Sequence, residues 1–321
     1  MPKQVVATDT HSSSPGAGSG ALELGWCAGA QTIYRNEQTV KGQSTLMEPP
    51  GANEGPAARA LRPQLQIVWH LVVPERANLN AQRVITPIVA NHVLASLPSA
   101  QFRGLRARLE PIRLEFGQVL YEPGDTIRFV YFPINCLISL LTAVGKRRTL
   151  EVGMVGNEGM AGMSLVMGVG VSGVRALVQG EGEALRMAAD PFRIEFNRNR
   201  LLRKALLLYM HALMTQISQT AACNRFHPAR ARLARWLMMT RDRVGRDEFP
   251  LTHEFLAHML GLRRVGITEA ASTFRRRKLI RYHRGVIQIL DAKGLEASCC
   301  SCYRVVKDAY ERARMPDVDR L

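Results

Sequence analysis

The chain has 321 residues, of which 46% are hydrophobic, so it is long enough for two domains with substantial cores. Lysine and arginine together number 43 against 27 aspartate and glutamate residues, which gives a formal net charge of +16 and a pI near 10.2. This excess predicts a polyanionic partner, namely DNA, RNA or an anionic membrane surface, although a generally soluble basic protein has the same composition.

We expect neither secretion nor a membrane span. The first residues, MPKQVVATDTHSSSPGAGSG, contain no apolar core of a signal peptide. The longest apolar runs, such as ALLLYMHALM, fall short of the roughly 18–20 residues that span a bilayer. The 6 cysteines form no regular disulfide framework, because the last three, Cys299, Cys300 and Cys302, are too crowded. A reducing cytoplasm is therefore the expected compartment.

Residues 1–85 are rich in serine, glycine, proline and alanine and show no sustained period. We predict a flexible, largely disordered tail there. The apolar segment VWHLVV (68–73) stands out in it, and it indicates no function. Order is expected from near Asn91, where apolar residues first recur at helical spacing, with an interruption at Pro98.

The next part of the chain has the pattern of short strands. Residues 113–144 alternate between apolar and polar, with turn signals at Gly117, at 123–125 and at Asn135. A glycine-rich stretch comes next, and residues 174–188 have the pattern of two strands about a turn. So many short strands within about 80 residues predict a small barrel or roll.

The period then changes to that of a long helix, from about Asp190 to Asn224. The positions that recur every three or four residues are Leu202, Leu206, Tyr209, Leu213, Gln216 and Thr220, with Ile217 alongside. Such a stripe predicts either a dimer seam or packing against the chain's own domain, and the pattern alone does not choose. Pro228 marks a break, and a second helix over residues 229–245 ends at Gly245.

Residues 251–280 contain two histidines beside a glutamate, which raises the possibility of a metal site. A zinc protease helix needs His-Glu-x-x-His, because positions i and i+4 share one helix face. Here His253 and His258 are five residues apart, so they point about 140° away from each other at roughly 100° per residue. We therefore predict no metal site in this segment.

The same segment has the features of a helix-turn-helix. Thr252 is placed to cap a first helix, Leu251 and Leu256 to form a hydrophobic staple, and Gly261 to allow a tight turn. The predicted buried face of the second helix consists of Ile267, Ala270, Ala271 and Phe274. Ala270 and Ala271 are small, so they let the two helices cross closely. The first turns of the second helix are then free to lie in a DNA major groove. A structural helix pair with a solvated basic face is the alternative.

The residues after the second helix indicate a wing. The run RRRK (275–278) places four cations at the helix end, where they suit the dipole and can reach phosphates. LIRYHRGVIQIL then has the pattern of two strands about Arg284 and Gly285. Arg281, His283 and Arg284 lie near the tip of this hairpin, so the segment is predicted to be a winged helix-turn-helix.

With these elements in place, the sequence resembles the Crp/Fnr family of bacterial transcription regulators, over residues 90–298. The motifs that carry the resemblance are FGQVLYEPGD (116–125), VYFPINCLISLL (130–141) and GNEGMAG (156–162), in this order before the helix-turn-helix. The resemblance implies an α+β fold. Its expected parts are a cyclic-nucleotide-binding-like sensory β-roll (90–196), a dimerisation helix (197–226), the winged helix-turn-helix (227–298) and a C-terminal extension (299–321).

The resemblance also implies which residues contact DNA. The base-reading positions of the family correspond to Arg264, Val265 and Glu269. Arg264 can pair with guanine, Glu269 can accept from a cytosine amino group, and Val265 can touch a thymine methyl. The neighbouring Arg263 and Thr268 complete the predicted base-contact set. The predicted phosphate contacts are Thr252, Arg275, Arg276 and Arg284.

The effector site departs from the family pattern. Members that bind cyclic AMP hold its phosphate with an Arg-Ser pair, whereas this chain has Ser172 and Gly173 there. The predicted effector pocket consists of Glu158, Gly159, Ser172 and Arg175. Cyclic nucleotide is not the expected ligand, because a buried phosphate without an opposing cation is costly.

Cofactors are not expected either. The oxygen-sensing members carry an N-terminal cysteine cluster, and here that region has only Cys27, which argues against an iron–sulfur centre. Cys299, Cys300 and Cys302 could form a thiol sensor or a metal clip, but the sequence places no fourth partner beside them. No metal ligand is therefore predicted.

The expected function is that of a homodimeric, sequence-specific transcription regulator that binds a palindromic operator and senses an unknown effector. Its expected partners are double-stranded DNA, a second copy of the chain and RNA polymerase, with no membrane. The alternative is a constitutive or nonspecific architectural DNA-binding protein that has lost effector binding. No enzyme is expected: there is no catalytic triad or Walker loop, and VGMVGNEGMAG does not open a helix in a βαβ unit.

Overall fold

The computed structural model describes residues 91–144 and 148–314, which all belong to one compact unit. The expectations for residues 1–85, Cys27 included, lie outside the described residues. The described helices are α2 (His92–Ala95), α3 (Ser99–Arg106), α4 (Ala189–Arg198), α5 (Arg200–Phe226), α6 (Ala229–Val244), α7 (His253–Leu260), α8 (Arg264–Arg276), α9 (Ala292–Glu296) and α10 (Ser301–Arg314), with a 3-10 turn η1 (Met163–Leu165).

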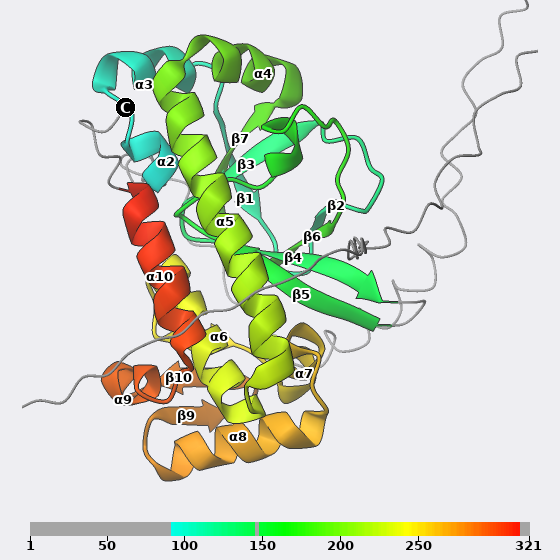
Figure 1. Ribbon diagram of the computed structural model, residues 1–321, viewed down its shortest axis with the longest axis vertical. Helices are drawn as coiled ribbons and strands as arrows, with labels where there is room; N and C mark the ends of the chain where they lie inside the picture. The colour runs from blue at the N-terminus through cyan, green and yellow to red at the C-terminus, as the bar shows by residue number, and fades with distance from the viewer. Residues whose placement is uncertain (1–90, 145–147, 315–321) are drawn as a thin grey trace, which may run out of the picture. The chain divides into compact units, whose positions relative to one another are not determined.

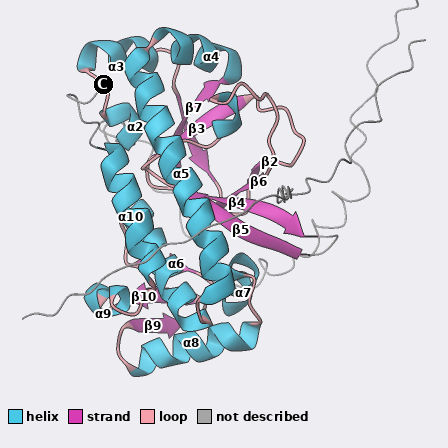
Figure 2. Cartoon of the chain, viewed as in Figure 1, coloured by secondary structure: helices cyan, strands magenta, loops and turns pink. Residues whose placement is uncertain are grey.

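The strands gather in the first half of the described chain and again near its end (Figures 1 and 2). They are β1 (Glu110–Leu114), β2 (Val119–Tyr121), β3 (Phe129–Pro133), β4 (Leu137–Val144), β5 (Arg148–Val155), β6 (Arg175–Gly180), β7 (Gly182–Ala188), β8 (Glu248–Pro250), β9 (Ile280–His283) and β10 (Val286–Ile289). The α+β fold class is confirmed.

The predicted roll consists of two antiparallel sheets. One sheet has the strand order β2-β6-β4-β5 and the other the order β1-β7-β3. Val130, Phe132 and Ile138 are fully buried in its core. The strands β6 and β7 follow each other at the predicted turn, yet they pair in different sheets. The glycines predicted as turns include Gly117 and Gly124, whose positive φ values of 79° and 91° favour glycine over other residues.

The prediction of a single helix from about Asp190 is wrong in one respect, because the helix is interrupted at Asn199. This residue has extended backbone angles of φ −98° and ψ 100°. Its side-chain oxygen accepts hydrogen bonds from the backbone N–H groups of Leu201 and Leu202 at 3.1 and 3.0 Å. An asparagine that caps in this way starts a new helix, so α4 ends at Arg198 and the long helix α5 begins at Arg200 rather than at 197.

The stripe on α5 packs against the chain itself. All six of its recurring residues, from Leu202 to Thr220, are buried. Contacts of α5 with α10, β5 and α2 account for this burial, and α10 runs alongside α5 in Figure 1. Ile217, which the sequence placed beside the stripe, is instead 37% exposed. The intrachain alternative is therefore correct for the stripe, and any dimer seam lies on another face of the helix.

Two buried side chains of α6 reach into the roll. Trp236 Nε1 donates to Glu151 Oε1 on β5 at 2.8 Å. Arg243 Nε donates to Glu158 Oε1, in the loop after β5, at 2.9 Å. All four side chains are buried. The helix α6, which precedes the helix-turn-helix, is therefore held against the roll by one hydrogen bond to a carboxyl group and one ion pair.

Glu151 gives the fold a pH dependence. Burial raises the pKa of Glu151 to about 7, although hydrogen bonds from Ser139 and Trp236 oppose the shift. The folded protein therefore holds this proton up to a higher pH than the unfolded chain does. Because the folded pKa lies above the unfolded value of 4.5, the free energy of unfolding falls as pH rises from about 4.5 to 7.

We predict that Glu151→Gln removes this slope. The neutral amide keeps an acceptor for Trp236 and carries no charge to desolvate, so the variant should gain on the order of 3 kcal/mol relative to wild type between pH 4.5 and 8. Denaturant unfolding at a series of pH values measures this. Glu115→Gln, at an exposed position, is the matched control and should run parallel to wild type. If the free energy of unfolding of Glu151→Gln changed with pH in parallel with that of wild type, the Glu151 carboxyl group would already be ionised in the folded protein.

Candidate nucleic-acid interface

The helix-turn-helix consists of α7 and α8. Thr252 Oγ1 accepts a hydrogen bond from Phe255 N at 3.1 Å, so the predicted cap is confirmed. The staple residues Leu251 and Leu256 are both buried. Gly261 has a φ of 59° and ends α7, which makes the predicted tight turn. The four residues predicted as the inner face of α8 are at most 5% exposed: Ile267, Ala270, Ala271 and Phe274.

The opposite face of α8 is open. The predicted base-contact residues are all exposed: Arg263, Arg264, Val265, Thr268 and Glu269. Val265 is an apolar side chain with 65% of its surface exposed. Arg263 occupies the N-cap position and Arg264 begins the helix. The first two turns of α8 therefore present an unpacked surface of mixed charge with one apolar position, which is the composition that groove reading requires.

Two of these residues also make contacts inside the protein. Thr268 Oγ1 donates to the carbonyl of Arg264 at 3.0 Å and lies 3.1 Å from His253 Nδ1. Arg264 Nε lies 3.8 Å from Glu254 Oε2, at an exposed position where such pairs contribute little. Within the part of the chain that the structure describes, the Glu269 carboxylate has no hydrogen bond or ion pair.

The wing comes after α8 as expected. β9 and β10 pair in antiparallel register with His283 opposite Val286. The turn residues Arg284 and Gly285 have φ values of 47° and 79°, and two positive φ values characterise the two-residue turns that fit the twist of a hairpin. A third strand, β8, pairs with β10 on its other side. The sequence analysis missed β8, because three residues are too few to establish a period.

The predicted phosphate contacts lie at the ends of these elements. Arg275 and Arg276 are exposed in the last turn of α8, and Arg284 is exposed at the tip of the wing. Thr252 is partly exposed at the start of α7, where its hydroxyl oxygen serves as the cap. The cations therefore flank the base-reading surface, which is where phosphates would lie if α8 occupied a groove.

His253 has a role that the sequence analysis missed. Its ring stacks on Tyr282 of the wing, with 4.3 Å between ring centroids and 18° between planes. Its Nδ1 meets Thr268 on α8. Burial, helped by the charge of Arg264, lowers the pKa of His253. A neutral histidine thus ties α7 to both the recognition helix and the wing, and its partners could not be seen from sequence spacing.

The comparisons with known proteins agree with this geometry. Residues 231–298 match the model of the Crp-like helix-turn-helix domain. Among solved structures, a Crp/Fnr-family protein from Eubacterium rectale has a TM-score of 0.51 and 18% identity, and the match covers 66% of this chain and 97% of that one. The c-di-GMP-responsive global regulator CLP of Xanthomonas campestris has a TM-score of 0.50 and 14% identity, with 60% and 99% covered. Residues 231–298 therefore form a Crp-like helix-turn-helix domain.

The comparison with curated proteins finds no match. The family match confirms the prediction of a helix-turn-helix DNA-binding domain. Because the identity to these two solved structures is low, their similarity to this chain concerns the fold alone. No described helix is long and apolar enough to cross a membrane.

Two of the predicted effector residues, Ser172 and Arg175, interact with other residues of the protein. Ser172 Oγ donates to the carbonyl of Val174 at 2.7 Å, so it is engaged in its own turn. Arg175 is buried and pairs with Glu122, with 2.9 Å between Nη2 and Oε1. A guanidinium already neutralised by a carboxylate is a poor holder of a ligand phosphate. Both side chains therefore have a partner inside the protein, while Arg175 Nε is buried without a hydrogen-bond partner in the part of the chain that the structure describes.

Glu158 and Gly159 are likewise engaged. The Glu158 carboxylate pairs with Arg243 in a buried position. A Cβ atom added at Gly159 would lie 1.9 Å from the ring of Tyr209 on α5, so the loop reaches the helix only because this residue is glycine. These two positions hold the loop against α5 and α6.

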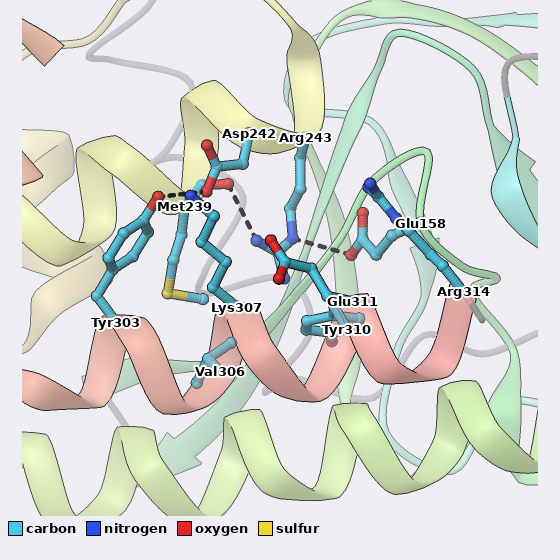
Figure 3. A pocket seen from close by; sticks show the side chains of 10 residues that line it. All are labelled: Glu158, Met239, Asp242, Arg243, Tyr303, Val306, Lys307, Tyr310, Glu311 and Arg314. Carbon is cyan, nitrogen blue, oxygen red and sulfur yellow. Dashed lines mark hydrogen bonds and ion pairs between the residues drawn. The ribbon is translucent and has the colours of Figure 1, made fainter. Parts of the chain in front are cut away.

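A cavity of about 180 Å³ lies between α6 and α10, as Figure 3 shows. Its lining residues are Glu158, Met239, Asp242, Arg243, Tyr303, Val306, Lys307, Tyr310, Glu311 and Arg314. Arg243 lies at its inner side, where Nη2 donates to Gln216 Oε1 at 2.5 Å and the guanidinium lies over the Tyr310 ring at 4.9 Å. Among the predicted effector residues, Glu158 alone lines this cavity.

The expectation that the C-terminal cysteines lack a fourth partner is wrong. α10 folds back along α5, and this places Cys300 and Cys302 beside Cys223 and His227 at the end of α5. The four side chains come from segments about 75 residues apart in the sequence. The Cys-x-x-x-His spacing of Cys223 and His227 was the one signal in the sequence that could have pointed to the cluster.

We predict that Gly159→Ala strongly destabilises the protein. The added methyl group overlaps the Tyr209 ring, so the loop must move and the Glu158 ion pair is strained, at a cost of roughly 1–3 kcal/mol or more. Gly104→Ala is the matched control, because Gly104 lies in α3 with nothing within 4 Å of an added Cβ. That change should stabilise the protein by roughly 0.5–1 kcal/mol. Thermal unfolding of both variants measures the difference, and equal midpoints would contradict the close packing.

Proposed function

We propose that this protein is a sequence-specific transcription regulator that binds DNA as a homodimer through α8. The observation that carries the proposal is the two-sided character of α8 within a Crp-like domain. Its inner face is packed on α7 and α6, and Arg264, Val265 and Glu269 on its first turns are exposed. A helix held in this way can enter a major groove with its fixed face toward the protein.

Each exposed position has a distinct base chemistry. Arg264 can donate two hydrogen bonds to guanine O6 and N7, and Glu269 can accept one from a cytosine amino group. Val265 offers contact with a thymine methyl, and Arg263 and Thr268 flank the set. Arg275, Arg276, Arg284 and Thr252 would contact phosphates, supplying affinity that does not depend on base sequence.

The proposed dimer uses the exposed face of α5. Leu207, Met214 and Ile217 are 43%, 60% and 37% exposed. Leu207 and Met214 lie at a positions of a heptad pattern, and Ile217 lies at a d position. The partly buried Met210, at a d position, and the exposed Ala221, at an a position, continue the pattern. Two such helices can pair along this face while the opposite face stays packed on α10 and β5. A two-fold dimer would place its α8 helices about one DNA turn apart, which predicts a palindromic operator.

An effector-free mode of action is the second candidate. The predicted phosphate holder Arg175 is paired with Glu122, and Glu158 is paired with Arg243. These ion pairs favour a roll that does not bind a cyclic nucleotide at the predicted positions. A constitutive regulator or a nonspecific architectural protein would have the same internal pairing, and DNA selection distinguishes the two.

The first experiment is selection of the purified protein on randomised duplex DNA, with affinities measured at two salt concentrations. We expect a palindromic consensus. Arg264→Ala and Glu269→Ala should each relax one position of each half-site, at roughly 1–3 kcal/mol. Arg276→Ala, a phosphate contact, is the control and should weaken all sequences alike and lower the salt dependence. A flat selection, unchanged by added cyclic AMP or c-di-GMP, would favour the architectural alternative.

A second experiment tests the dimer. Met214→Glu and Ile217→Glu each place a charge on the proposed seam, so they should shift the protein toward the monomer in sedimentation or light-scattering measurements. Leu201→Glu is the matched control, because Leu201 is 41% exposed on α5 but lies off the heptad positions. It should leave the dimer intact. An equal effect of all three variants, or none from the seam variants, would rule out this face.

A further inference from the structure

Four metal-binding side chains meet where α5 ends and α10 begins. Cys223 lies in the last turns of α5, His227 caps that helix, and Cys300 and Cys302 stand at the start of α10. Their ligand atoms all lie within 4.8 Å of one another. The sulfurs of Cys223 and Cys300 are 3.5 Å apart, and Cys302 Sγ lies 3.5 Å from His227 Nδ1.

These separations suit one small tetrahedral ion. With Zn–S near 2.3 Å and Zn–N near 2.0 Å, tetrahedral ligands lie roughly 3.3–3.8 Å apart. The two contacts of 3.5 Å fall in this range, and the limit of 4.8 Å leaves an adjustment of about one ångström for the widest pair. An iron–sulfur cluster spreads its thiolates around a core of several atoms, so it needs a wider arrangement.

The backbone explains why the four meet. Positions 223 and 227 are i and i+4, so they share one side of the helix end, and His227 N donates to the carbonyl of Cys223 at 3.1 Å. Cys300 and Cys302 are brought to this end by the packing of α10 on α5. They also lie at the N-terminus of α10, where the helix dipole favours negative thiolates.

A buried cation faces the cluster. Arg235 is 3% exposed, and no carboxylate lies within ion-pair distance of it in the described ranges 91–144 and 148–314. Its Nη1 only donates to Thr220 Oγ1 at 3.3 Å and contacts Met239 Sδ at 3.4 Å. Its positive charge acts electrostatically on Cys223 and on Cys302. A buried guanidinium needs an anion, and a zinc ion with three thiolates and a neutral histidine carries one net negative charge.

Cys299, one residue before Cys300, has a different environment. Its Sγ lies 3.5 Å from the carbonyl oxygen of Leu295. The adjacent cysteine is therefore outside the cluster and provides a natural control.

We propose that Cys223, His227, Cys300 and Cys302 bind a single zinc ion. The ion replaces the protons of the thiols that are still protonated, and these protons are released to solvent. All four ligands come from the protein, which leaves no open position and makes the site structural. It fastens α10 to the junction between α5 and α6, and α10 in turn covers Arg243 and Glu158 through Tyr310.

The test uses the full chain, purified with reductant and zinc and then freed of unbound metal. We expect about one zinc per chain by elemental analysis and native mass spectrometry. Cys300→Ser and Cys302→Ser should lose most of it, while Cys299→Ser keeps it. Chelation should lower the unfolding midpoint of wild type and of Cys299→Ser by several degrees, and change Cys300→Ser little.

Cobalt(II) provides a readout on the wild-type chain, so this test does not require any variant to fold. Bound to the wild-type chain, it should give the visible bands of a tetrahedral ion and thiolate-to-metal charge transfer, and added zinc should abolish both. The proposal is overturned by any of three results. These are no stoichiometric zinc in the reduced protein, iron with acid-labile sulfide in its place, or equal metal loss from Cys299→Ser and Cys300→Ser.

Discussion

The buried ion pair of Arg243 and Glu158 is the constraint on which the arrangement of the described chain depends. A charge removed from water is stable only when it is paired and hydrogen-bonded. Arg243 meets this condition through Glu158, Gln216 and the backbone of Met239, which belong to the roll, to α5 and to α6. One side chain thus fixes three parts of the molecule together. Moving α6 away from the roll would leave at least one buried charge unpaired.

This constraint connects the roll to the DNA-binding surface. α6 carries Arg243 and Trp236 toward the roll, and it also packs against α8. Any event that changes the roll near Glu151 or Glu158 therefore acts on the helix that supports the recognition helix. The same pair occupies the carboxylate of Glu158, one of the predicted effector residues. Here the loop after β5 serves as an internal contact, with Gly159 packed against Tyr209.

The C-terminal helix gives the architecture an additional layer. α10 covers the inner face of α5 and closes the Arg243 cavity with Tyr310, while its first residues join the cysteine and histidine cluster. A zinc ion there would hold one end of α10, and the aromatic packing of Tyr310 on Arg243 holds the other. The buried Arg235 would then have an anionic cluster beside it, in addition to its electrostatic interaction with Glu151.

Local patterns in the sequence determined the helix-turn-helix, the wing turn and the strand-rich roll, because caps, turn glycines and apolar periods act over a few residues. Thr252, Gly261 and the Arg284–Gly285 turn are examples. Only the tertiary structure decided which face of α5 is buried, that Arg175 and Glu158 pair internally, and that Cys300 meets Cys223. These outcomes depend on contacts between segments far apart in the chain, and a periodic pattern records that a face is buried but not what covers it.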